Sequence, residues 1–169
     1  MATKALISLE EYLKTSYPEM DCEYVDGEVF EKPMPPLDHA RLQKLLLKAF
    51  LRWEEQPGLF AFPELRNRTA ETRCRIPDIA VYAGAEPAEQ VPSIPPYVVI
   101  EILSPDDKAQ YLMAKLREYR GFGVPHIWVI DPASKSMHEY GSDGLREVAA
   151  LRMPEYSLQV THDDLFPNG

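Results

Sequence analysis

A glutamate stands in the middle of the most apolar strand-like segment of the sequence. Residues 97–103 read Tyr-Val-Val-Ile-Glu-Ile-Leu, a pattern typical of a buried central β-strand, with Glu101 at its fifth position. Because burying an unpaired charge costs several kcal/mol, Glu101 needs a cation, a proton or an open cleft beside it. The alternative is a glutamate on the exposed face of a half-buried strand, or one paired with an arginine.

A second carboxylate follows a proline just before another strand-like segment. Asp78 comes after Pro77 and precedes the apolar residues 79–82. Proline cannot donate to a central ladder, so Asp78 is expected at the mouth of that strand. Taken alone, a Pro-Asp pair is commonly a turn. Beside Glu101 it provides a second oxygen ligand for Mg²⁺, which usually takes one or two carboxylates and keeps several waters.

A lysine on the next amphipathic segment is a candidate cation for this acidic pair. Lys115 lies among Leu112, Leu116 and Tyr119 on a helix expected near residues 106–121. Its stem can pack on the sheet while its ammonium reaches the carboxylates. A snorkelling surface lysine is the alternative interpretation.

The elements that position these groups follow from apolar periodicity, capping residues and turn residues. Ser8 has capping-box spacing and opens a short helix that ends before Pro18. Asp26-Gly27 suits a two-residue hairpin turn, and Asp38 is expected to cap a long helix that runs to about residue 56. Strands are expected at 22–25, 28–30, 59–66, 77–83, 97–103 and 126–131, with a meander over 137–140, 145–151 and 157–160.

This order of elements predicts an α/β (α+β) domain with one mixed β-sheet flanked by helices. The first core helix is expected on one face of the sheet and the second on the other. A length of 169 residues favours a single domain over residues 1–169. The chain is 45% hydrophobic and 27% charged, which excludes disordered, collagen-like and coiled-coil classes.

The charge balance and the cysteine count limit the partners and the location. Lys and Arg number 18 against 27 Asp and Glu, so the net charge is −9 and a nucleic acid would have to be bound by a local basic patch. Cys22 and Cys74 are too few for a disulfide framework and lack zinc-site spacing, which favours reduced thiols and a cytoplasmic protein. The absence of a signal-peptide pattern and of a long apolar run predicts no membrane span.

Several segments together resemble one known family. They are Cys22-Glu23-Tyr24-Val25-Asp26-Gly27-Glu28, His39, Arg75-Ile76-Pro77-Asp78, Glu101-Ile102-Leu103-Ser104-Pro105, Lys115 with Tyr119, and Gly123-Val124-Pro125-His126-Ile127-Trp128-Val129-Ile130-Asp131. In order and spacing they resemble the Uma-type family of putative restriction endonucleases, which is similar to a branch of the PD-(D/E)XK nuclease superfamily. The resemblance covers nearly the whole chain. Its most specific segments are Glu-Ile-Leu-Ser-Pro at 101–105 and the segment at 123–131.

The resemblance implies a restriction-endonuclease-like core and Mg²⁺-dependent hydrolysis of DNA phosphodiester bonds, with Mn²⁺ as a substitute ion. Asp78 and Glu101 would be the acidic residues of the two motifs and would bind the metal. Leu103 stands where the superfamily has its lysine. Lys115 matches the position to which that lysine has moved in the related family, where it would position the nucleophile and offset developing charge.

Four further residues are candidate auxiliary members of the site. Glu23 and Asp26, with Glu28, lie on the first predicted hairpin and are candidate metal ligands or orienters; a solvated acidic hairpin is the alternative. His39 lies near the core side of its helix, either as a donor to a metal ligand or as a satisfied core histidine.

Two groups of cations are candidates for contact with DNA. Guanidinium groups bind phosphates well, and four arginines surround a predicted hairpin turn beside the acidic pair. These four are Arg66, Arg68, Arg73 and Arg75. A stripe of Arg41, Lys44, Lys48 and Arg52 follows one face of the first long helix. For each group the alternative interpretation is a solvated surface whose charges pair within the helix or across the hairpin.

The leading hypothesis is thus a metal-dependent DNA nuclease. A catalytically inactive nuclease-fold module for binding or assembly and a phosphoesterase acting on small nucleotides remain the alternatives. Leu47 and Leu51, expected to be exposed beside the basic stripe, suggest a homodimer.

Overall fold

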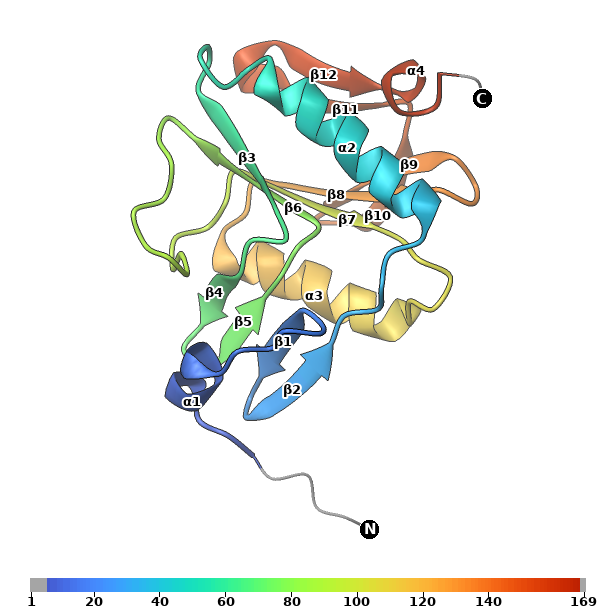
Figure 1. Ribbon diagram of the computed structural model, residues 1–169. Helices are drawn as coiled ribbons and strands as arrows, with labels where there is room; N and C mark the ends of the chain where they lie inside the picture. Colours follow the sequence, from blue (N-terminus) through green and yellow to red (C-terminus); the bar gives the residue numbers. More distant parts are fainter. Residues whose placement is uncertain (1–5, 168–169) are drawn as a thin grey trace.

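The computed structural model describes residues 6–167, which form a layered α/β structure (Figure 1). The helices are α1 (Leu9–Lys14), α2 (Leu37–Leu51), α3 (Ala109–Phe122) and α4 (His162–Leu165), with a 3₁₀ turn, η1, at Pro154–Tyr156. The strands are β1 (Cys22–Val25), β2 (Glu28–Glu31), β3 (Leu59–Pro63), β4 (Asn67–Ala70), β5 (Arg73–Arg75), β6 (Ile79–Ala83), β7 (Val98–Ile102), β8 (His126–Asp131), β9 (Ser136–Gly141), β10 (Gly144–Val148), β11 (Ala150–Met153) and β12 (Leu158–Thr161).

The strands form three sheets. The main sheet has six strands in the order β10-β9-β8-β7-β6-β3, and the N-terminal sheet has four in the order β2-β1-β5-β4. In the main sheet β7 and β8 are parallel, which requires a crossover, and α3 provides it. The remaining neighbours in this sheet are antiparallel. The predicted mixed sheet flanked by helices is therefore confirmed.

The expectation of only one sheet is wrong. The hairpin of β1 and β2 pairs with β5, where Tyr24 lies opposite Cys74, and so builds a separate layer with β4. At the other end of the chain β11 and β12 pair with each other instead of extending the meander. The pairing of β1 with β5 joins segments that are distant in the sequence, and local periodicity does not encode it. The pairing of β11 with β12 is local and forms a separate hairpin.

The two long helices cover opposite faces of the main sheet, as expected (Figure 1). Leu46 and Phe50 of α2 pack with Ile100 in the larger hydrophobic core. Leu116 of α3 packs with Val99 in a smaller core on the other face. Neighbouring residues of β7 thus point to opposite helices, because side chains alternate along a strand.

The first long helix is shorter than predicted. Helix α2 ends at Leu51, and the chain then forms turns up to Pro57. Asp38 does not cap the helix, because Pro36 occupies the N-cap position and Asp38 instead pairs with Arg41. None of the helices within residues 6–167 is long and apolar enough to cross a membrane.

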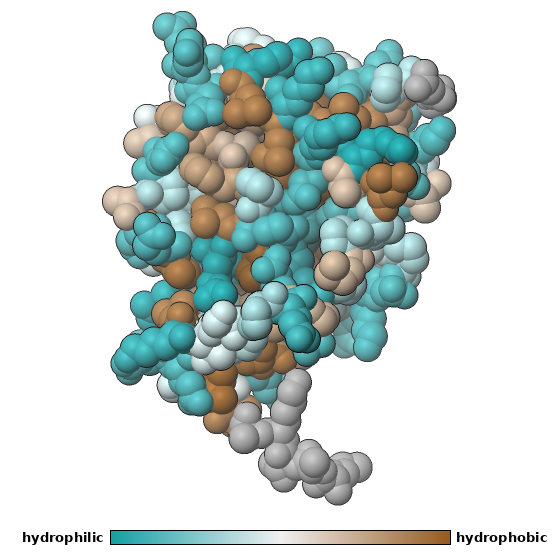
Figure 2. Space-filling model, in the orientation of Figure 1, coloured by the Kyte–Doolittle hydropathy of each residue, from teal (hydrophilic) through white to brown (hydrophobic). Residues whose placement is uncertain are grey.

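The surface expected to be apolar is smaller than predicted. Leu47 is partly buried and packs against the larger core, whereas Leu51 is exposed. Figure 2 shows hydrophilic and hydrophobic side chains interspersed over the face of the molecule seen in Figure 1. The homodimer therefore stays a prediction.

Candidate active site

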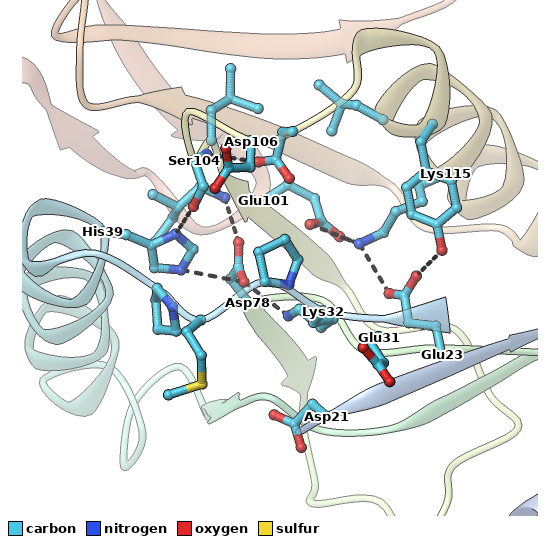
Figure 3. A pocket seen from close by; sticks show the side chains of 18 of the residues that line it. Asp21, Glu23, Glu31, Lys32, His39, Asp78, Glu101, Ser104, Asp106 and Lys115 are labelled. Carbon is cyan, nitrogen blue, oxygen red and sulfur yellow. Dashed lines mark hydrogen bonds and ion pairs between the residues drawn. The ribbon is translucent and has the colours of Figure 1, made fainter. Parts of the chain in front are cut away.

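A cavity of about 450 Å³ lies between the N-terminal sheet, the start of α3 and the ends of β6 and β7. It contains the three residues that the sequence singles out for catalysis: Asp78, Glu101 and Lys115 (Figure 3). Glu23 and His39 also line it. All five side chains are buried polar groups in the part of the chain that the structure describes.

Asp78 reaches the cavity because it directly precedes β6. Its Oδ2 accepts a hydrogen bond of 2.7 Å from the backbone N–H of Ile102 on β7, and its Oδ1 lies 3.0 Å from Lys32 Nζ. Burial alone would raise the pKa of Asp78. The Lys32 ammonium and the neighbouring His39 outweigh burial and hold that pKa well below its usual range. Asp78 is therefore an anion at neutral pH.

Glu101 points from β7 toward α3. Its Oε1 lies 2.9 Å from Lys115 Nζ and accepts a hydrogen bond of 2.7 Å from the hydroxyl of Tyr119, one helical turn further on. Burial raises the pKa of Glu101 to about 7, although the Lys115 ammonium acts in the opposite direction. The two carboxylates of the site thus differ in proton affinity, as acid and base partners in active sites do.

Glu23 extends this network into the N-terminal sheet. Its Oε1 lies 3.0 Å from Lys115 Nζ and accepts a hydrogen bond from the backbone N–H of Ile76. Its Oε2 accepts hydrogen bonds from Arg75 and Tyr111. Burial raises the pKa of Glu23, but the Lys115 and Arg75 cations and these hydrogen bonds dominate and lower it to about 2. Lys115 is consequently held between two carboxylates.

Two charged residues that sequence analysis missed complete the cavity. The ammonium of Lys32 pairs with Glu64 at 2.5 Å as well as with Asp78. The side-chain amide of Gln43 donates to Glu64 Oε1 and to the backbone carbonyl of Asp78. Gln43 lies one turn after His39 on α2, so helical spacing could have identified it. Lys32 lies in a connecting segment without periodicity, and Glu64 follows β3, which ends at Pro63 and is shorter than the strand expected at 59–66. No local signal marked either residue.

Asp26 does not belong to this site. It lies in the exposed turn between β1 and β2, where Arg73 and Thr72 bind its carboxylate. It is absent from the cavity walls among the residues that the structure describes. Of the two interpretations offered for Asp26, the structure fits the solvated acidic hairpin, because its side chain is exposed and pairs with Arg73.

The arginine cluster also lies outside the cavity. No arginine is among the described residues that line it. Arg75 is 3% exposed, and its three guanidinium nitrogens donate to Glu118, Glu23 and Tyr111. The expected phosphate contact by Arg75 is thus wrong, because this guanidinium is a buried structural cation.

The other three arginines are only partly buried. Arg73 pairs with Asp26 and Glu118, Arg66 lies 4.7 Å from the ring centroid of Tyr12, and Arg68 lies on β4. The residues of the predicted stripe are exposed: Arg41, Lys44 and Lys48 on α2, and Arg52 directly after it. The cations that line the cavity within residues 6–167 are instead Lys32, Lys108 and Lys115.

The donor atoms in the cavity fit a hard divalent cation. Carboxylate oxygens are the preferred protein ligands of Mg²⁺, and Asp78 and Glu101 present them from neighbouring strands. One ligand atom each from His39, Glu64 and Asp78 lie within 4.8 Å of one another. Among the described residues His39 Nε2 is a buried nitrogen without a hydrogen-bond partner.

The fold and the buried acidic site define a nuclease-like protein, and comparison with known proteins identifies its family. Residues 9–169 match the model of the Uma2 family, described as "Putative restriction endonuclease". The chain therefore belongs to the Uma2 family.

One solved structure similar to this chain is that of a putative nuclease belonging to DUF820 from Anabaena variabilis ATCC 29413. The two sequences are 27% identical, the match covers 95% of this chain and 98% of that one, and the TM-score is 0.83. A search of the curated proteins found no match.

Proposed function

We propose that the protein is a cytoplasmic Mg²⁺-dependent endonuclease that hydrolyses phosphodiester bonds of DNA, with Mn²⁺ as a substitute ion. The observation that carries this proposal is the convergence of three groups in one cavity. Asp78 directly precedes β6, Glu101 lies on the adjacent antiparallel strand β7, and Lys115 Nζ lies 2.9 Å from Glu101. Nuclease chemistry needs such a set: anions that hold a cation, and a positive group beside them.

In this proposal Asp78 and Glu101 would hold the metal ion. When bound, the ion supplies Lewis acidity that activates a water and stabilises charge on the scissile phosphate. The backbone N–H of Ile102 fixes the orientation of Asp78, and Tyr119 fixes that of Glu101. Preorganised groups of this kind need little rearrangement during the reaction.

Lys115 would stabilise the negative charge that develops on the phosphate. Its ammonium is buried, and Glu101 and Glu23 raise the pKa of Lys115 despite the opposing effect of burial. Lys115 therefore stays cationic over the physiological pH range. Glu23 and Glu101 hold the ammonium from two sides, so its position is set before the substrate arrives.

Outside the cavity, exposed cationic side chains would bind the DNA. Lys108 is exposed at the cavity wall, at the start of α3. The exposed stripe on α2 and the partly exposed Arg66, Arg68 and Arg73 are further candidates. A second copy of the chain, paired through the surface that includes Leu51, would extend the area available to a duplex.

A plasmid-cleavage assay tests the proposal. Purified protein is incubated with supercoiled plasmid and Mg²⁺ or Mn²⁺, alongside Asp78→Ala, Glu101→Gln and the surface control Leu145→Ala, which changes an exposed residue outside the proposed site and dimer surface. We expect nicking or linearisation by the wild type and the control, and a loss of about 10²-fold or more in both site variants, since each removes an interaction with the transition state.

Other outcomes identify the alternatives. Cleavage that persists in both site variants would mean a contaminating nuclease, and the proposal would be wrong. Hydrolysis of bis(p-nitrophenyl) phosphate without plasmid cleavage would indicate a phosphoesterase for small substrates. Binding of DNA and Mn²⁺ without either reaction would indicate an inactive nuclease-fold module.

A further inference from the structure

The ammonium of Lys32 is surrounded by oxygen atoms that suit a metal ion. Lys32 Nζ lies 2.5 Å from Glu64 Oε2, 2.9 Å from the backbone carbonyl of Ile76 and 3.0 Å from Asp78 Oδ1. Two carboxylates and a carbonyl are the hard oxygen ligands that Mg²⁺ and Mn²⁺ take. The group of atoms around Lys32 Nζ, referred to below as the cage, therefore binds a cation that the chain itself provides.

His39 provides independent evidence that the cage is more than an ion pair. Only 6% of its side chain is exposed. Its Nε2 makes no hydrogen bond within residues 6–167, and its contact there is an ion pair of 3.4 Å with Asp78 Oδ1, which directs the ring at the cage (Figure 3). Its Nδ1 lies 3.2 Å from Ser104 Oγ. Contact of the second ring nitrogen with a polar group is how proteins orient a metal-binding imidazole.

Glu64 is held in a conformation that needs support from its surroundings. Its φ of +49° lies in the left-handed region, which is unfavourable for a residue other than glycine. Gln43 donates to its Oε1 while Oε2 contacts Lys32, and this directs the carboxylate into the cavity. Strained backbone that persists in this way is common in binding sites.

Lys32 reaches the cage from a different layer of the protein. Its backbone N–H donates to the carbonyl of Asp21, which places Lys32 at the end of the hairpin of the N-terminal sheet. The side chain then extends to Asp78 at the edge of the main sheet and to Glu64 after β3. The cation and the anions thus come from separate layers, so a substitution of the lysine removes the cation without removing any of the oxygen ligands.

We propose that the cage, with His39 beside it, is a second divalent-cation position in which the Lys32 ammonium substitutes for the ion. It is distinct from the position shared by Asp78 and Glu101, and only this first position rests on the proposed function. Two-metal nucleases use two cations to stabilise the attacking and leaving oxygens. In this protein one divalent ion and one fixed ammonium provide the two positive charges.

Counting bound ions tests this directly. Mn²⁺ is titrated by calorimetry into the full-length wild type, Lys32→Met, the double variant Lys32→Met with Glu64→Gln, and the control Lys108→Met, which removes another lysine of the cavity. We expect Lys32→Met to bind one ion more than the wild type. The double variant and the control should both match the wild type.

The count also separates this inference from the proposed nuclease. If Lys32→Met binds no more ions than the wild type, or if the double variant keeps the additional ion, the cage is not a cation position. An additional ion in Lys32→Met together with an absence of DNA cleavage by the wild type would support the cage and refute the nuclease.

Two further measurements test the inference even if Lys32→Met folds poorly. Without metal this variant leaves Asp78 and Glu64 facing each other unneutralised, so its Tm should fall, and Mn²⁺ should raise that Tm more than it raises the Tm of the wild type. An equal or smaller rise would contradict the inference. Glu64→Gln alone should bind Mn²⁺ with an affinity within about twofold of the wild type, and a loss of tenfold or more would place the first ion at Glu64 and overturn it.

Discussion

The two faces of the main sheet are covered by different kinds of buried side chain. On the α2 side Leu46, Phe50 and Trp128 belong to a continuous apolar core. On the α3 side the apolar cluster is smaller, and Glu101 and Lys115 are buried beside it. Strand β7 serves both faces, because its alternating side chains supply isoleucines to one and a carboxylate to the other. Most of the apolar core and the Glu101–Lys115 pair thus lie on opposite faces of β7, while α2 also contributes His39 and Gln43 to the cavity.

On the α3 side the buried charged side chains form ion pairs with one another. Glu23 has Lys115 and Arg75 as partners, and Arg75 also pairs with Glu118. Buried ion pairs contribute little net stability compared with apolar packing, but removing one partner is costly. This side therefore fixes the geometry of the site, while the α2 side supplies most of the hydrophobic stabilisation.

The largest effect on stability is expected on the α2 side. Phe50 is fully buried and packs against Trp53 and Trp128, so Phe50→Ala should lower the free energy of unfolding by about 3–5 kcal/mol. Urea denaturation measures this. The exposed Leu51→Ala on the same helix is the control and should change stability by less than about 0.5 kcal/mol.

The separation of the two faces would be contradicted by one result. Phe50→Ala should bind Mn²⁺ as the wild type does under conditions in which it is folded. A tenfold loss of Mn²⁺ affinity in the folded variant would show that the apolar side also determines the geometry of the site.

A smaller, pH-dependent effect is expected on the α3 side. The folded protein lowers the pKa of Glu23 from 4.5 to about 2, because Lys115 and Arg75 outweigh burial. The stabilisation is fully present above the unfolded pKa of 4.5 and is lost as the pH falls toward 2. The loss corresponds to about 3 kcal/mol for a shift of this size.

Urea denaturation between pH 6 and pH 2.5 compares the wild type with Glu23→Gln. The variant should be less stable at pH 6, and the difference between the two proteins should shrink as the pH falls. A difference that stays constant over this range would mean that Glu23 is not held as an anion by its partners.

The smallest effect is expected at an exposed ion pair. Arg73 lies 2.7 Å from Asp26, and both side chains are more than a third exposed, so Arg73→Ala should cost no more than about 1 kcal/mol. Thermal denaturation at low and high salt measures it, and salt should reduce the difference from the wild type. A larger loss that is independent of salt would assign Arg73 to the buried network of Arg75.

The residues of the site differ in how well the sequence predicts them, and the reason is physical. Glu101 interrupts an apolar run and Asp78 follows a proline, so local chemistry marks both positions. Lys115 is identified by helical spacing. The order along the chain of the strands and helices that build the main sheet follows from the same local patterns.

Lys32 has no such signal, because it meets Asp78 only when the N-terminal sheet docks against the main sheet. Glu64 comes beside Asp78 through the pairing of β3 with β6, where Pro63 lies opposite Ile79. Arg75 looks like a surface cation in a hairpin, but β5 pairs with both β1 and β4, and Glu118 of α3 covers it. Pairing between distant segments determines burial here, and the sequence of one hairpin does not contain that information.

Mn²⁺ titration by calorimetry of the wild type, Asp78→Asn and Glu101→Gln tests most directly whether the buried acids form a metal site. The wild type should bind at least one ion, and each variant should lose at least tenfold in affinity while retaining the wild-type circular dichroism spectrum. Equal affinity in all three proteins would place the metal elsewhere and remove the basis for the proposed hydrolysis.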